Sequence, residues 1–255
     1  MAVIGIMSAM HEELAGVLAQ MPDEHRVTVG GRDFYVGHWQ GHAVVAVLSR
    51  IGKGAAATTA TLLITRFGVD RLVFTGVAGG LGAGVQVGDV VVATHCVQHD
   101  MDASPLVPPH EVPLYGRAHF AAAVELSAQL AQATQRVLQD VAQHLGPAAQ
   151  AEFGLQAPQV HRGLVISGDR FVSASAESQA LRRVFPDALA VEMEGAAVAQ
   201  VCFDFGVPFA AMRTISDRAD EAAHVDFNRF IQAVASRYSL AILSVWLSHT
   251  RHEAR

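Results

Sequence analysis

Short apolar runs recur along the chain, and longer segments with a helical spacing of apolar positions lie between them. The short runs are rich in Val, Ile and Leu, a composition that favours strands buried on both faces. Strands are predicted at residues 3–7, 43–48, 71–75, 89–94, 163–168, 189–192 and 209–214. Helices are predicted at residues 11–20, 54–67, 120–145, 176–184, 195–205 and 227–247.

This alternation of strands and helices predicts an α/β fold with a central, largely parallel sheet. No internal repeat divides the chain, so residues 1–255 are expected to form a single domain. In open α/β sheets the ligand binds outside the carboxyl ends of the strands. The residues that follow each predicted strand are therefore the first candidates for a functional site.

The segment 100–117 breaks the pattern, because four prolines exclude a helix or a central strand while apolar side chains remain. The prolines are Pro105, Pro108, Pro109 and Pro113, and the apolar residues are Leu106, Val107, Val112, Leu114 and Tyr115. Two interpretations stay open: a loop folded onto its own core, or a subunit contact that closes a neighbour's pocket. Residues 147–157, rich in Ala and Gln, are expected to be only a connector.

Composition narrows the class of protein. A hydrophobic fraction of 51% and a charged fraction of 16% allow a large core. A net charge of -6 argues against a nucleic-acid partner. Cys96 and Cys202 lie in apolar stretches, which favours buried thiols over a disulfide. No leader and no uninterrupted membrane-spanning run is visible, so we expect a cytoplasmic protein without a membrane contact.

Acidic and glycine-rich groups gather after several predicted strands. Glu12 and Glu13 follow the first strand, and a Thr-Gly-Val-Ala-Gly-Gly segment ends at Gly80. Glu192 ends the sixth strand, and Glu194 follows it. Ser216 and Asp217 come after the last strand, and Arg213 is the nearest cation in sequence. Carboxylates collected at one sheet edge predict acid/base chemistry on a neutral or cationic ligand.

Each of these signals also has a structural explanation. A carboxylate at Glu13 suits the first turn of a helix, Asp217 could cap the following segment, and Gly79 with Gly80 could form a tight turn. Glu194 precedes a small-residue helix start, where a buried carboxylate needs a partner or a ligand hydroxyl. Apolar residues near strand ends, such as Met10 and Phe171, are more often core than ligand contacts.

Other chemistries are disfavoured. The close histidine pairs lack the full set of further acidic or cysteine ligands that a metal site needs, so no metal is expected. Ser167-Gly168-Asp169 is not a nucleophile elbow, which disfavours acyl transfer. The glycines form neither a GxGxxG nor a Walker motif, so no nucleotide phosphate is implied.

Taken together, the motifs resemble those of the 5′-methylthioadenosine/S-adenosylhomocysteine nucleosidases, within the nucleoside phosphorylase and hydrolase superfamily. The matching segments keep a consistent order over nearly the whole chain. They are residues 4–13 (IGIMSAMHEE), 52–53 (GK), 75–80 (TGVAGG), 87–91 (VGDVV), 163–171 (GLVISGDRF), 191–194 (VEME) and 213–220 (RTISDRAD). The resemblance implies a three-layer α/β/α sandwich around a twisted mixed sheet, usually in a homodimer, and no cofactor.

The resemblance also implies roles for individual residues. Glu13 would activate water, Glu194 would bind the ribose hydroxyls, and Asp217 would be the acid facing adenine N7. The other implied substrate contacts are Met10, Ile51, Ala78, Gly79, Phe171, Val172, Met193, Arg213, Ser216 and Phe227. Among them, the Phe171 ring would stack on the base, while Met10, Ile51 and Phe227 would line an apolar pocket for the 5′ substituent.

Two departures from the family pattern bear on the expected chemistry. Many members carry Ser where this chain has Val77, and that hydroxyl helps to hold the attacking water. Here the water would depend on Glu13, Arg213 and backbone groups. The loop 104–117 lacks the aromatic, Gly-rich sequence common in bacterial members, which leaves the preference for the 5′ substituent open.

Several alternatives remain at this point. A phosphorylase would place phosphate beside Glu13, and like charges in a pocket of low dielectric repel each other. Hydrolysis is therefore preferred. Futalosine and 5′-deoxyadenosine are alternative substrates, because the shared motifs contact the purine and ribose more than the tail. A nucleoside sensor without activity is the alternative from another class, although Glu13, Glu194 and Asp217 together argue against it.

Overall fold

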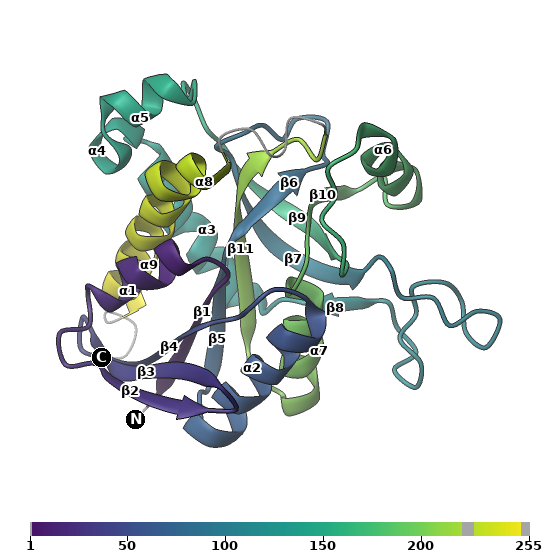
Figure 1. Cartoon of the computed structure of the whole chain (residues 1–255), viewed down its shortest axis with the longest axis horizontal. Helices are drawn as coiled ribbons and strands as arrows, with labels where there is room; N and C mark the ends of the chain where they lie inside the picture. Colours follow the sequence, from purple (N-terminus) through teal and green to yellow (C-terminus); the bar gives the residue numbers. More distant parts are fainter. Residues whose placement is uncertain (1, 221–226, 251–255) are drawn as a thin grey trace.

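The computed structural model describes residues 2–220 and 227–250. Its strands form an 11-stranded sheet in the order β2-β3-β4-β1-β5-β11-β6-β10-β9-β7-β8 (Figure 1). The strand bounds are β1 Val3–Ser8, β2 His25–Val29, β3 Arg32–Trp39, β4 His42–Leu48, β5 Arg71–Thr75, β6 Val77–Gly80, β7 Val90–Gln98, β8 His119–Ala121, β9 Val160–Ser167, β10 Ala188–Glu192 and β11 Phe209–Asp217. The helix bounds are α1 His11–Leu18, α2 Lys53–Phe67, α3 Val124–Leu138, α4 Val141–Leu145, α5 Pro147–Glu152, α6 Ser175–Val184, α7 Gly195–Phe205, α8 Phe227–Phe230, a π-helix Ile231–Ala235 and α9 Ser236–Thr250.

The sheet is mixed rather than largely parallel. Strands β4, β1, β5 and β11 run parallel, while β2, β3, β8 and the β6–β10 pair add antiparallel contacts. An additional antiparallel pairing joins β11 to β7, so β11, β6, β10, β9 and β7 form a closed ring. The ring brings the ends of β6, β10 and β11 together around one space.

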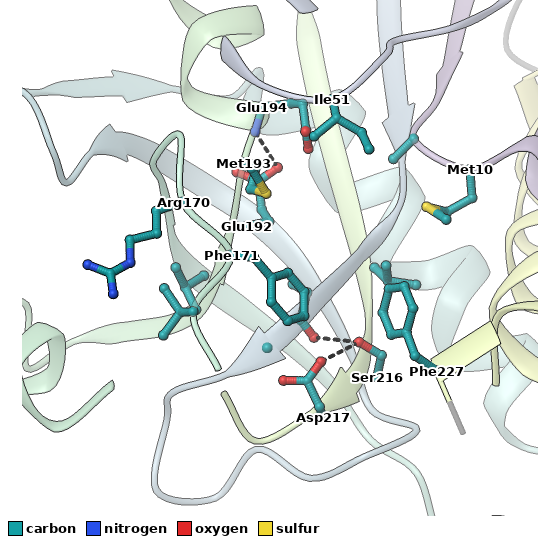
Figure 2. Close-up of a pocket in the computed structure, with 16 residues that line it drawn as sticks. Met10, Ile51, Arg170, Phe171, Glu192, Met193, Glu194, Ser216, Asp217 and Phe227 are labelled. Carbon is teal, nitrogen blue, oxygen red and sulfur yellow. Dashed lines mark hydrogen bonds between the residues drawn. The ribbon is translucent and has the colours of Figure 1, made fainter. Parts of the chain in front are cut away.

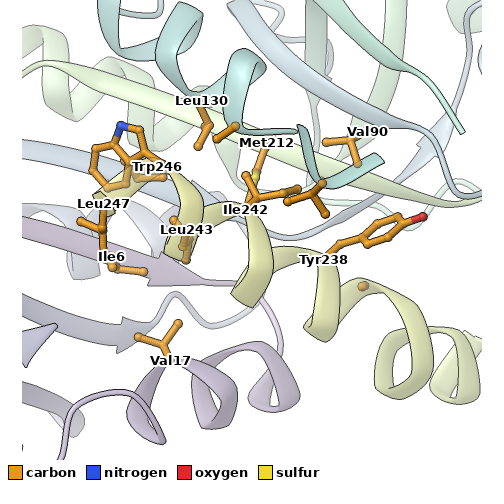
Figure 3. Close-up of a cluster of buried hydrophobic side chains, with 14 of the residues drawn as sticks. Ile6, Val17, Val90, Leu130, Met212, Tyr238, Ile242, Leu243, Trp246 and Leu247 are labelled. Atoms are coloured by element: carbon orange, nitrogen blue, oxygen red, sulfur yellow. The ribbon is translucent and has the colours of Figure 1, made fainter. Parts of the chain in front are cut away.

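Alternating side chains on the central strands explain the three layers. On β1, Ile4 and Ile6 point to a cluster shared with α1, α3 and α9, whereas Met7 belongs to the cluster beneath α2 and α7. Because side chains alternate along a strand, each apolar strand supplies both layers at once. Figure 3 shows the first cluster, in which Trp246 and Leu247 of α9 pack near Ile6.

The C-terminal helical run from Phe227 to Thr250 is long and apolar enough to cross a membrane, with a mean hydropathy of 1.4 over its most apolar window. The large apolar side chains of this run are mostly buried inside the fold. Tyr238, Ile242 and Trp246 are fully buried, and α9 packs against both α1 and α3. In this fold the run is a core helix.

Several elements differ from the sequence prediction. The sequence pattern does not predict the hairpin β2–β3. Its many polar residues obscure the alternation of apolar and polar positions that indicates a strand. The predicted helix 120–145 is divided: β8 ends at Ala121, α3 ends at Leu138, and the Asp140 side chain caps α4 by accepting from Gln143 N. Residues 147–152 form α5 rather than a plain connector, with Pro147 in its first turn, where proline is tolerated.

Candidate active site

A cavity opens where the ends of β1, β4, β6, β9, β10 and β11 converge (Figure 2). It encloses about 760 Å³, including space open to solvent, which suits a small-molecule ligand. Its lining residues are Ala9, Met10, Ile51, Val77, Ala78, Gly79, Arg170, Phe171, Val172, Val191, Glu192, Met193, Glu194, Ser216, Asp217 and Phe227.

Eleven of the thirteen residues singled out in the sequence line this cavity, and the exceptions are Glu13 and Arg213. Segments separated by more than 200 residues, from Met10 to Phe227, meet here because β1 and β11 both flank β5 in the sheet. The general expectation that the Met and Phe residues near strand ends are core residues is wrong for Met10, Phe171, Met193 and Phe227. Their side chains form cavity wall instead.

Glu13 lies behind the cavity wall and is fully buried. It occupies the third position of α1, where its Oε2 accepts the Met10 N–H at 3.1 Å and its Oε1 accepts the Ser239 hydroxyl at 2.6 Å. Burial raises the pKa of Glu13, whereas the Ser239 hydrogen bond and the charge of Arg213 act in the opposite direction. Glu13 therefore serves the helix start, and its role as the base stays a prediction.

Arg213 is also buried and is absent from the cavity lining, and its contact with substrate stays a prediction. Its Nη2 and Nε donate to Glu192 Oε2 at 2.9 and 3.2 Å, and its Nη1 donates to two backbone carbonyls. The guanidinium also lies 4.1 Å from the Phe74 ring centroid. Because a buried charge needs a partner, Arg213 is held by Glu192 and acts on the site through its charge.

Glu194 sits in the turn between β10 and α7, with its side chain directed toward Ile51 in Figure 2. Its Oε1 accepts the Gly52 N–H at 2.9 Å. Burial, reinforced by the charge of neighbouring Glu192, raises the pKa of Glu194 to about 7. A carboxylate with that pKa changes its charge within the physiological range.

Asp217 ends β11 on the opposite side of the view from Glu194 (Figure 2). Its Oδ2 accepts the Ser216 hydroxyl and its Oδ1 accepts the Ala219 N–H, both at 2.7 Å. A side chain at Gly79 would come within 3.0 Å of Asp217 Oδ1 and 2.9 Å of Ala219 Cβ. Gly79 therefore serves close approach within β6, rather than the tight turn considered from sequence.

The remaining wall is apolar. The rings of Phe171 and Phe227 meet edge to face with centroids 6.2 Å apart, and Met10, Ile51 and Met193 surround them. Phe171 is 41% exposed and Ile51 is 73% exposed, so both lie at the mouth. An aromatic ring in the wall of a cavity that also holds carboxylates suits a flat, polar-edged ring such as a purine base.

Sequence reasoning missed several groups that position these carboxylates. The sequence shows Glu192 as an acidic residue at a strand end but does not indicate that it pairs with Arg213. The hydroxyl of Ser239 and the Gly52 N–H carried no readable signal, because both act across long separations in the chain. A buried serine on the apolar face of the last predicted helix was the only available hint.

The segment 100–117 does not contribute to the cavity of its own chain within the described residues. Val112 is buried, and the Tyr115 hydroxyl donates to Asp204 at 2.9 Å, so this part folds onto its own core. Leu106 and Leu114 instead point to solvent with 87% and 103% exposure. In Figure 1 the segment between β7 and β8 projects from the body of the fold.

The described residues hold no cluster of three His, Cys, Asp or Glu side chains placed to bind a metal ion. Both cysteines, Cys96 and Cys202, are buried free thiols.

Comparison with known proteins gives consistent matches. Residues 3–245 match the profile of the phosphorylase superfamily. The chain is 38% identical over 251 residues to the 5′-methylthioadenosine/S-adenosylhomocysteine nucleosidase of Marinomonas sp. (strain MWYL1), covering 95% of this chain and 97% of the relative.

Solved structures agree. A nucleosidase of the same name from Neisseria meningitidis, in complex with methylthio-immucillin-A, matches with a TM-score of 0.85, 32% identity and coverage of 98% and 100% of the two chains. The native futalosine hydrolase of Helicobacter pylori matches with a TM-score of 0.83, 32% identity and coverage of 97% and 98%. The fold is thus the expected nucleoside phosphorylase/hydrolase fold. The chain belongs to the phosphorylase superfamily and, within it, to the 5′-methylthioadenosine/S-adenosylhomocysteine nucleosidase family.

Proposed function

We propose that the protein hydrolyses the N-glycosidic bond of 5′-methylthioadenosine or S-adenosylhomocysteine and releases adenine. The observation that carries this proposal is the pair Glu194 and Asp217, two carboxylates that face one apolar cavity from different walls. A third carboxylate, Glu13, lies buried behind the Met10 wall.

Asp217 is the proton donor in this proposal. Breaking the N-glycosidic bond sends an electron pair to the adenine, and a proton delivered to N7 neutralises it. The Ser216 hydroxyl and the Ala219 N–H fix the carboxyl group in place. The Phe171 ring would stack on the base, and the backbone of Phe171 and Val172 would contact its polar edge.

Glu194 stabilises the sugar. Its carboxylate accepts ribose hydroxyls and places negative charge near the cation that develops at C1′. Because the pKa of Glu194 is about 7, the charged form becomes populated as the pH rises through neutrality. Met193 lies next to it on the cavity wall and would pack against the ribose.

Glu13 completes the reaction by taking one proton from water while the hydroxyl adds to C1′. Its carboxylate lies outside the cavity lining, so the water has to pass the lining residues, or the side chain has to turn toward the cavity. Val77, which lines the cavity, offers no hydroxyl to hold that water. Arg213 supports the ionised form of Glu13 through its charge.

A phosphorylase reaction is less well supported. Phosphate needs several cationic or hydroxyl donors, and of the lining residues in the described chain only Arg170 carries a positive charge. The Arg170 side chain is 76% exposed and pairs with Glu177. Futalosine stays the second candidate substrate, because futalosine hydrolases of Helicobacter pylori share the fold.

The proposal includes a homodimer in the cytoplasm. Leu106 and Leu114 are large apolar side chains that protrude from a proline-rich segment, which suits a second copy that buries them. That copy would close the tail pocket formed by Met10, Ile51 and Phe227.

The decisive experiment measures adenine release from 5′-methylthioadenosine with and without phosphate. Equal rates with free methylthioribose as product support hydrolysis. A rate that requires phosphate and yields a sugar 1-phosphate would establish a phosphorylase, and tight binding without release would establish a sensor. Parallel assays with S-adenosylhomocysteine, futalosine and 5′-deoxyadenosine compare kcat/KM for the different 5′ substituents.

A further inference from the structure

Three charged side chains outside the cavity form a closed cluster just behind its rim. Lys53 Nζ is ion-paired with Asp100 Oδ1. Asp100 Oδ2 accepts the Asp169 N–H at 2.9 Å, and Asp169 Oδ1 accepts the Lys53 N–H at 2.7 Å. The three contacts join residues that follow β4, β7 and β9, which are distant in sequence.

Each of two segments in the cluster continues directly into the cavity. Ile51 lines the cavity next to Gly52, whose N–H holds Glu194, and Lys53 follows immediately. Asp169 is followed by Arg170, Phe171 and Val172, which all line the cavity. The two segments also pass close to each other, because a side chain at Gly52 would lie 3.1 Å from Asp169 Oδ1.

The cluster is more than a surface ion pair. Exposed ion pairs contribute little because solvent screens them and the side chains lose entropy. Here the Lys53 side chain is only 14% exposed and the Asp100 side chain 34%, while Asp169 is exposed. Two of the three contacts are charge-assisted bonds to backbone N–H groups. Partial burial works against ionisation of Asp100, yet Lys53 and the Asp169 N–H hold its pKa below the ordinary value. Because these two carboxylates accept backbone N–H groups, they restrain the backbone at Lys53 and at Asp169.

We propose that Lys53, Asp100 and Asp169 act as a positioning cluster that locks residues 51–53 to residues 168–172. The cluster thereby holds the Gly52 amide against Glu194 and the Phe171 ring over the cavity. This inference rests on the proposed function, because it assigns those two segments to the ribose and the base.

The first test compares steady-state kinetics of matched variants. Asp169→Ala removes the acceptor of the Lys53 N–H, so KM for 5′-methylthioadenosine is expected to rise about tenfold, with kcat changed less than about threefold. Asp169→Asn keeps an oxygen at that position and is expected to restore most of the affinity. Asp187→Ala is the control, because that exposed carboxylate precedes the first residue of β10, whereas the cavity lies at the last residues of this strand.

The second test needs no activity and uses hydrogen–deuterium exchange. Asp100→Ala changes a third segment, and it is expected to speed exchange in both peptides 50–56 and 168–173. Exchange that changes only around residue 100, or an unchanged KM in Asp169→Ala, would overturn the proposal. If the wild-type protein released no adenine, the proposed function would fail while the exchange result still decided whether the cluster couples the two segments.

Discussion

The Ser239 hydroxyl donates a 2.6 Å hydrogen bond to Glu13 Oε1, joining the last helix of the fold to the first. Glu13 Oε2 is occupied as well, by the Met10 N–H. Both oxygens of the proposed base are therefore held by groups that the protein supplies. The π-helix Ile231–Ala235 lies directly before α9, the helix that carries Ser239.

Ser239→Ala is expected to lower kcat roughly tenfold, because the base loses a fixed orientation. Burial raises the pKa of Glu13, and the Ser239 bond is the strongest influence that lowers it. Its loss raises that pKa further, so the acid-side midpoint of the kcat profile should move to higher pH. Ser236→Ala is the control, since that hydroxyl bonds to Gln232 O in the adjoining π-helix and does not contact Glu13. An unchanged pH profile would remove Ser239 from the mechanism.

Glu13→Gln is expected to abolish hydrolysis while leaving ligand affinity nearly intact. The side chain lies outside the cavity wall, so it acts on water more than on the nucleoside. Calorimetric titration with a C-nucleoside analogue of adenosine, which has no bond to hydrolyse, measures this affinity directly. Loss of binding in parallel with loss of rate would assign Glu13 to substrate positioning.

Asp217→Asn is expected to lower kcat by roughly 10²-fold, because an amide cannot deliver a proton to N7. The amide oxygen can still accept the Ala219 N–H, so the turn at the end of β11 should survive. Ser216→Ala removes only a supporting hydroxyl and should cost much less. Near wild-type turnover in a folded Asn variant would show that another group protonates adenine.

Glu194→Gln is expected to stabilise the protein at alkaline pH while impairing catalysis. Burial raises the pKa of Glu194 from 4.5 to about 7, so the folded state binds this proton more tightly than the unfolded state. The contribution of Glu194 to the free energy of unfolding therefore falls as the pH rises from 4.5 to about 7, and it is constant above that pH. The Tm of the variant should exceed that of the wild type at pH 8, with the difference closing toward pH 4.5. Equal Tm values at both pH values would contradict the assigned pKa.

Leu106→Asp combined with Leu114→Asp is expected to weaken self-association and to raise KM for 5′-methylthioadenosine more than it changes kcat. The structure favours this pair over Val107, which is half-buried, because both leucines face solvent. Analytical ultracentrifugation at assay concentration provides the measurement. A wild-type protein that sediments as a fully active monomer would rule out the shared site.

The position of cavity residues could be predicted from the sequence where those residues follow a strand. Glu194, Ser216 and Asp217 follow apolar runs long enough to identify, and their strands converge because the fold brings the ends of β10 and β11 to one cavity. The family resemblance supplied the mixed sheet and the residue roles. Periodicity alone suggested parallel strands.

Long-range pairing could not be obtained from the sequence. Nothing near Arg213 indicated that Glu192 would occupy its guanidinium, since the partners lie 21 residues apart on different strands. The same holds for the edge strand β2 and its neighbour β3, which carry mixed polar residues on a partly exposed hairpin. The pattern of apolar residues in a segment predicts which of its side chains are buried. Their partners in the fold depend on which strands become neighbours in the sheet.

The hydrogen bond between Glu13 and Ser239 spans 226 residues, so its two halves leave the ribosome at very different times. At ordinary rates of translation, roughly 10 to 45 seconds separate the synthesis of the two residues. During that interval the nascent chain carries the first carboxylate of the site without the helix that covers it. Phe227 arrives with the same late segment. The cavity is therefore completed as a last event of synthesis, and a prematurely terminated chain lacks a finished site even when most of its sheet is present.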